Sequence, residues 1–180
     1  ASHLDPGDYR AYDMLADVFA SLEGEENHAA ARRYFEKSLS LYPQSWNAYH
    51  RLGVLLQNTG QCEEAVTYSE KAIQLRPTAE FAYITEVDSL FWLGRTTEAE
   101  AVIKRGLSQS PSSSILRGLD AYAAAERKDP KAVEAIVREL RATWPETSAT
   151  AIFLGGLGAY AQRDLPALQA RWMPYLERLR

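Results

Sequence analysis

Four prolines recur along this chain at one constant interval, and their spacing restricts its possible folds more than any other feature. Pro43, Pro77, Pro111 and Pro145 follow one another every 34 residues. Proline lacks a backbone N–H and its ring clashes with the preceding helical turn, so it ends one helix before another begins. A period in the range of about 20 to 50 residues predicts an array of similar structural repeats.

The same frame aligns small residues at the positions where paired helices would cross. Glycine or alanine stands at the eighth position of three of the five units, at the twentieth position of four and at the twenty-seventh position of two, for example Gly53, Ala65 and Ala72. Gly60 and Gly94 are expected in the turns between paired helices, where a residue without a Cβ permits positive φ. The residues expected to cap helix N-termini through a side-chain oxygen are Ser45, Thr78, Asp129 and Asp164.

The second unit carries the fullest motif. Its residues Trp46, Tyr49, Leu52, Gly53, Leu56, Gly60, Ala65, Tyr68, Ala72 and Pro77 resemble a nearly complete tetratricopeptide repeat. The resemblance implies an all-α fold, a right-handed α-solenoid of about five helix-turn-helix repeats. We expect a single array over residues 1–180, with repeats at about 12–45, 46–79, 80–113, 114–147 and 148–173 and a C-terminal helix at 174–180.

Each repeat is expected to contain two helices. Their predicted ranges are about 8–24 and 27–41, 45–58 and 61–75, 79–93 and 96–109, 113–127 and 130–143, and 147–162 and 165–173. The chain starts with Ala1-Ser2-His3 rather than an initiator methionine, so we interpret it as a fragment of a larger protein.

The resemblance also implies that the first helix of each repeat lines a concave groove. In this family the second, fifth, sixth, ninth, twelfth and thirteenth positions of a unit face that groove. The partner-binding candidates taken from these positions are Asn47, His50, Arg51, Phe81, Ile84, Asp88, Phe91, Trp92, Leu119, Tyr122, Phe153 and Tyr160.

The groove positions change from acidic in the first unit to aromatic and aliphatic in units 3–5. Two interpretations stay open. Units 3–5 hold an apolar peptide or an amphipathic helix, or their side chains pack on one another and on the C-terminal helix.

Two binding modes known in the family do not match this sequence. A clamp for a terminal carboxylate needs Lys, Asn and Arg, whereas the matching positions here are Ala16, Ala20, Arg51 and Asp88. A ladder of asparagines at the sixth position, found in sugar transferases, is replaced by Asp17, Arg51, Thr85, Leu119 and Phe153.

No residue pattern points to catalysis, a metal or a cofactor. His3, His28 and His50 are scattered, and Cys62 has no second ligand at metal-site spacing. The glycines at 155–158 follow no predicted strand and lack the tail of a phosphate-binding loop. We therefore expect no metal site, no cofactor and no enzymatic activity.

Net charge, apolar runs and cysteine content limit the possible classes of partner further. A net charge of −4 does not favour binding to nucleic acid. No apolar run reaches the roughly 20 residues of a membrane span. The single cysteine allows no intramolecular disulfide, so cytoplasm and periplasm both stay open.

The expected function is a non-catalytic scaffold that binds a peptide, helix or protein in its groove as part of a larger assembly. Richness in Arg, Leu and Ala favours a bacterial source. The alternative is a regulatory or substrate-docking domain of an enzyme, or of a secretion or polysaccharide-export protein. Self-association through the apolar units is a third hypothesis.

Overall fold

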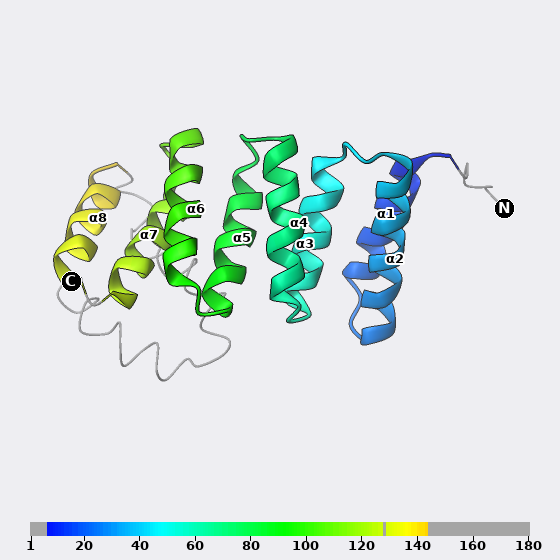
Figure 1. Ribbon diagram of the computed structural model, residues 1–180, viewed down its shortest axis with the longest axis horizontal. Coiled ribbons are helices and arrows are strands. Elements are labelled where there is room, and N and C mark those ends of the chain that lie inside the picture. The colour runs from blue at the N-terminus through cyan, green and yellow to red at the C-terminus, as the bar shows by residue number, and fades with distance from the viewer. Residues whose placement is uncertain (1–6, 128, 144–180) are drawn as a thin grey trace. The chain divides into compact units, whose positions relative to one another are not determined.

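The computed structural model describes residues 7–127 and 129–143, and all the regular secondary structure in these ranges is helical (Figure 1). This confirms the all-α fold class. The fifth repeat at 148–173 and the helix at 174–180 lie outside the described residues. The helices are α1 (Tyr9–Ala20), α2 (Glu25–Leu41), α3 (Trp46–Asn58), α4 (Cys62–Leu75), α5 (Glu80–Trp92), α6 (Thr96–Gln109), α7 (Ser114–Glu126) and α8 (Pro130–Thr143).

The chain divides into two compact units, Ala1–Pro111 and Ser112–Arg180. The first contains α1 to α6 and the second contains α7 and α8. Within the first unit, α1 packs on α2, α3 on α4 and α5 on α6, so each repeat is a helix pair. Successive pairs also touch, because α2 packs on α3, α4 on α5 and α3 on α5. A single array over the whole chain stays a prediction.

Side-chain caps begin several of the helices. The Ala48 N–H donates to Ser45 Oγ at 3.2 Å, and the Ala132 N–H donates to Asp129 Oδ1 at 3.0 Å, as expected. The expected cap at Thr78 is wrong, because α5 begins one residue later with Ala79 as its N-cap. Ser113 caps α7 by accepting a hydrogen bond from the Leu116 N–H at 3.1 Å. It is not among the caps predicted from the sequence.

Glycines in the left-handed region make the turns inside the helix pairs. Gly60 has φ 80° and Gly94 has φ 72°, which confirms their predicted role. In the first repeat Gly24 takes φ 106° as the N-cap of α2. α1 ends at Ala20 with Ser21 as its C-cap, so it is shorter than the predicted 8–24.

Small residues bring the two helices of the second repeat close together. A Cβ added to Gly53 of α3 would stand 2.8 Å from Ser69 Oγ and 3.4 Å from the Ala65 carbonyl oxygen, both in α4. Ala65 and Ser69 have no exposed surface. The core that this approach permits joins the first two repeats, since it includes Phe35 and Leu39 of α2 with Leu52 and Leu56 of α3.

We expect substitutions at the Gly53–Ser69 contact to be non-additive. Ser69 Oγ is buried and has no hydrogen-bond partner among the described residues, so Ser69→Ala removes an unsatisfied group. Gly53→Ala alone gains helix propensity, about 1 kcal/mol, but presses its Cβ on that hydroxyl. The double variant should therefore be more stable than the sum of the two single changes by about 0.5–1.5 kcal/mol in urea unfolding. Additive changes would show that the hydroxyl does not limit the helix approach.

Candidate functional site

The first helices of the three repeats in the first unit bring predicted groove residues together. Arg51 of α3 forms an ion pair with Asp17 of α1. The His50 ring of α3 lies 6.5 Å from the Phe81 ring of α5, measured between centroids. These contacts place one face of α1, α3 and α5 on a continuous surface, called here the first-helix face. Its described members are Asp13, Asp17, Asn47, His50, Arg51, Val54, Gln57, Phe81, Ile84 and Asp88.

The candidate residues differ in their exposure. Phe81 is 64% exposed, which is unusual for a large aromatic side chain, whereas Phe91 is 8% exposed. Asn47, His50, Arg51, Ile84, Asp88 and Trp92 are half-buried. In the second unit, Leu119 is buried and Tyr122 is half-buried. Phe91 and Leu119 thus pack inside the protein in this structure, while Phe153 and Tyr160 lie outside the described residues.

A hollow of about 350 Å³ opens on the first-helix face between α1 and α3. Its walls are polar and charged, with Asp17 and Ser21 on the α1 side and His50, Arg51 and Asn58 on the α3 side. Apolar side chains complete its lining: Ala20, Phe35, Val54 and Leu55. This mixture of an apolar lining with a few polar groups is typical of sites that bind peptide or small organic groups.

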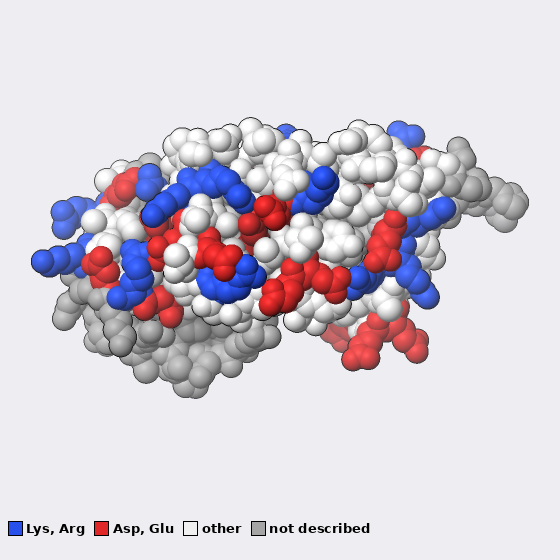
Figure 2. Space-filling model, in the orientation of Figure 1, with Lys and Arg blue, Asp and Glu red and all other residues white. Residues whose placement is uncertain are grey.

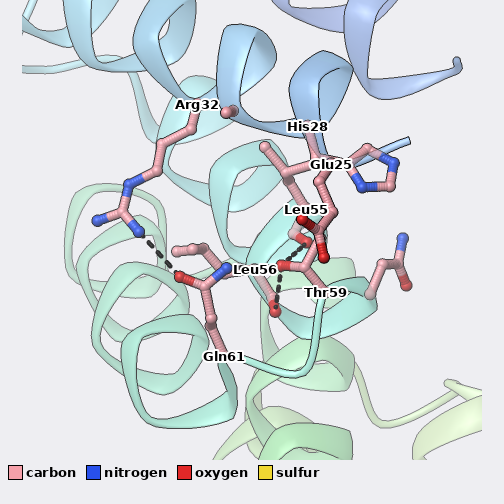
Figure 3. Close-up of a pocket in the computed structure, with 9 residues that line it drawn as sticks. Glu25, His28, Arg32, Leu55, Leu56, Thr59 and Gln61 are labelled. Carbon is pink, nitrogen blue, oxygen red and sulfur yellow. Dashed lines mark hydrogen bonds between the residues drawn. The ribbon is translucent and has the colours of Figure 1, made fainter. Parts of the chain in front are cut away.

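A second cavity of about 500 Å³, the turn-side cleft, lies between α2 and the end of α3. Figure 3 shows Glu25, His28 and Arg32 on one side and Leu55, Leu56, Thr59 and Gln61 on the other. The cleft is bridged where the Arg32 guanidinium donates to Gln61 Oε1 at 3.0 Å (Figure 3). Arg32 also pairs with Glu64 at 2.6 Å, so its charge is already compensated.

His28 lines both cavities, and it is not among the partner-binding candidates predicted from the sequence. It belongs to a second helix, whereas the groove positions of the family belong to first helices. Its place in the first turns of α2, near the loop between paired helices, was the only available signal. Leu55 and Asn58 are likewise shared, so the two cavities meet at the junction of the first two repeats.

Burial perturbs the titratable groups of the first-helix face. It raises the pKa of Asp88 to about 7, partly opposed by a hydrogen bond from Gln57. Asp88 Oδ1 and Asp13 Oδ1 are buried and accept no hydrogen bond from the described residues. Burial, and secondarily the charge of Arg51, lowers the pKa of His50. These two unsatisfied acceptors lie beneath the surface of the first-helix face, where their desolvation costs free energy.

A second perturbed carboxyl lies on α5, directed toward α6 rather than toward the groove. Burial raises the pKa of Glu86 to about 7, although Arg105 of α6 pairs with it at 2.9 Å. The same guanidinium lies 5.6 Å from the centroid of the Tyr83 ring. This ion pair joins the two helices of the third repeat and is not a candidate binding group.

Acidic and basic side chains are interspersed on the face that Figure 2 shows. Ion pairs among the described residues include Arg95 with Glu98 at 2.5 Å and Arg32 with Glu36 at 2.9 Å. Among the described residues, no group of three or more His, Cys, Asp or Glu side chains could hold a metal ion. Nor is any helix in residues 7–127 and 129–143 long and apolar enough to cross a membrane.

Comparison with protein families finds the same repeat twice. A family model described as "Tetratricopeptide repeat" matches residues 9–45, and a second with that description matches 34–67. The chain is 32% identical over 108 residues to "Protein STIP1 homolog" of Dictyostelium discoideum, which covers 58% of this chain and 19% of that protein. It is 35% identical over 106 residues to "Protein O-mannosyl-transferase Tmtc1" of Drosophila melanogaster, covering 57% and 12%. The chain thus spans less than a fifth of the length of each of these curated relatives.

Solved structures share the fold at low sequence identity. The crystal structure of MamA superposes with a TM-score of 0.72 at 15% identity, covering 80% of this chain and 82% of that one. YrrB, described as a TPR protein with an unusual peptide-binding site, superposes with a TM-score of 0.65 at 16% identity, covering 89% and 81%.

The raised pKa of Asp88 predicts a pH dependence of stability. Because the folded value of about 7 exceeds the unfolded value of 3.8, the folded state keeps a proton that the unfolded state releases. The free energy of unfolding should then fall as the pH rises from 5 to 8, by about 1–3 kcal/mol for this group.

Urea unfolding of the wild type and of Asp88→Asn at pH 5 and pH 8 separates the contribution of Asp88 to the free energy of unfolding from the contributions of Glu86 and His50. The wild type should lose more stability than the variant between pH 5 and 8. Glu23→Gln, at an exposed position, is the matched control and should follow the wild type. Parallel pH profiles for the wild type and Asp88→Asn would contradict the assignment.

Proposed function

Because the chain belongs to the tetratricopeptide-repeat family, we propose that it is a non-catalytic protein-interaction scaffold that binds a peptide, helix or protein segment on its first-helix face. The observation that carries this proposal is the convergence of groove residues from three helices. Asp17 meets Arg51 at a hollow that is open between α1 and α3, and His50, which also lines this hollow, meets Phe81.

The chemistry of the face favours a partner with both apolar and hydrogen-bonding side chains. Phe81 offers an exposed aromatic anchor, and such residues contribute strongly to binding energy. Asp88 lies seven residues further along α5, on the same side of the helix and two turns away. A partner that sets an apolar side chain against Phe81 and a polar side chain two turns away, near the half-buried Asp88, therefore suits this helix, and an amphipathic peptide has that pattern.

The charge arrangement argues against recognition of a terminal carboxylate by a clamp of free cations. Arg51, the single cation at the four matching positions, already pairs with Asp17. Asp88 at another of these positions would repel a carboxylate whenever it is ionised. The wider proposal places the scaffold in a larger bacterial assembly, on the composition of the chain alone.

A second candidate function is that of a docking or regulatory arm of an enzyme. It is favoured by the similarity to part of Tmtc1, whose name is that of an O-mannosyl-transferase. The sequence of the parent gene separates the two candidates. A flanking transferase or other catalytic domain would favour the docking arm, and its absence would favour a free-standing scaffold.

We expect Phe81→Ser to weaken partner binding by about tenfold or more, since loss of a central aromatic anchor typically costs about 2 kcal/mol. The partner is first obtained by affinity capture with the wild-type domain and identified by mass spectrometry. Its affinity for each variant is then measured by titration calorimetry.

Leu41→Ser is the matched control, because Leu41 is also an exposed large apolar residue but lies at the end of a second helix. It should bind as the wild type does. Equal binding by Phe81→Ser, with an unchanged helical circular dichroism spectrum, would refute the assignment of the site to this face.

A further inference from the structure

A row of large apolar side chains is exposed along α1, on a side of the helix next to the groove positions. Met14 is 70% exposed, Val18 is 57% exposed, and Leu22, just past the end of the helix, is 46% exposed. Residues four apart lie one above the other on a helix, so these side chains form a continuous strip, called here the α1 stripe. An apolar strip of this kind on a folded protein marks an interaction surface.

The equivalent positions in the next two repeats are buried. Adding 34 to each number gives Ala48, Leu52 and Leu56, all with no exposed surface. Adding 68 gives Ala82, Glu86 and Leu90, which are 0%, 5% and 2% exposed. The exposure of the α1 stripe is therefore a property of the first repeat and not of these repeat positions.

The structure also shows what covers these positions in the later repeats. Leu52 and Leu56 of α3 share one apolar cluster with Phe35 and Leu39 of α2, the second helix of the preceding repeat. In the same way α4 packs on α5. In both cases the cover is an amphipathic helix.

We propose that the α1 stripe is a docking surface for an amphipathic α-helix, which lies on α1 as α2 lies on α3. This surface is separate from the first-helix face. The docking helix needs large apolar residues four apart, as Phe35 and Leu39 are in α2. It also needs a small residue opposite Met14, because this methionine stands where α3 and α5 carry an alanine and needs more room.

A helix of this type fits better than a second copy of the same stripe. The three members of the stripe are all large, so two stripes facing each other would offer no small residue to receive Met14. The second helices of this fold do combine small and large residues at the required spacing, as Ala31, Phe35 and Leu39 do in α2.

The test uses a synthetic peptide of residues 24–42, because this segment contains the helix that covers the equivalent stripe on α3. The chain contains two methionines, Met14 and Met173, so ¹³C-methyl methionine labelling gives two NMR signals, and Met14→Leu assigns them. Addition of the peptide should shift the Met14 signal in a saturable way. Val18→Glu should weaken the apparent affinity at least tenfold.

Two controls keep the result specific. Phe81→Ser should leave peptide binding unchanged, which separates this surface from the groove of the proposed function. A peptide with Phe35→Glu and Leu39→Glu should not bind. Because Val18 is exposed, Val18→Glu should keep the wild-type circular dichroism spectrum and urea midpoint.

Three results would overturn the proposal. The first is no shift of the Met14 signal up to millimolar peptide, and the second is equal binding by the wild type and Val18→Glu. The third is a concentration-dependent dimer in light scattering that Val18→Glu abolishes while the peptide has no effect. This last result would assign the stripe to a second copy of the chain.

Discussion

The packing of each first helix under the second helix of the preceding repeat is the contact on which the first unit depends. A single helix pair cannot enclose its own apolar side chains, so it needs a neighbour on either side. At α3, Leu52 and Leu56 are fully buried in one apolar cluster that includes Phe35 and Leu39 of α2. Small residues such as Gly53 let the paired helices approach, and the glycine turns at Gly60 and Gly94 return the chain for the next helix. The fold of the first unit is thus a repetition of one local packing arrangement.

Polar contacts add specificity to this apolar repetition. Arg32 joins α2 to α4, and Arg51 joins α3 to α1, so each of these arginines links the first repeat to the second. Such partly exposed ion pairs contribute little to stability, about 0–1 kcal/mol each, but they fix how neighbouring repeats are aligned. The buried carboxyls on α5 have the opposite effect, because their desolvation makes ionisation costly. Asp88 Oδ1 is buried and has no hydrogen-bond partner among the described residues.

The first unit therefore carries two surfaces of different character. The first-helix face combines a charged hollow at the first two repeats with an aromatic side chain at the third. The α1 stripe is apolar throughout and is a side of the helix that is covered in the later repeats. The two surfaces share no residues.

The sequence alone determined the helical repeat, since prolines and small residues at one interval act through local backbone geometry that needs no distant contact. It also identified the caps at Ser45 and Asp129 and the positive-φ glycines, for the same reason. Thr78 was misplaced as a cap because a shift of one residue in a turn depends on how the flanking helices pack. Only the tertiary structure decided which groove positions are accessible: Phe81 is exposed and Phe91 is buried, although both are aromatic residues of one helix. The tertiary structure also placed the hollow between the first and second repeats, added His28 to its lining, and exposed the α1 stripe. These features arise from contacts between helices distant in sequence, and a repeat pattern assigns the same role to every unit whether or not a neighbour covers it.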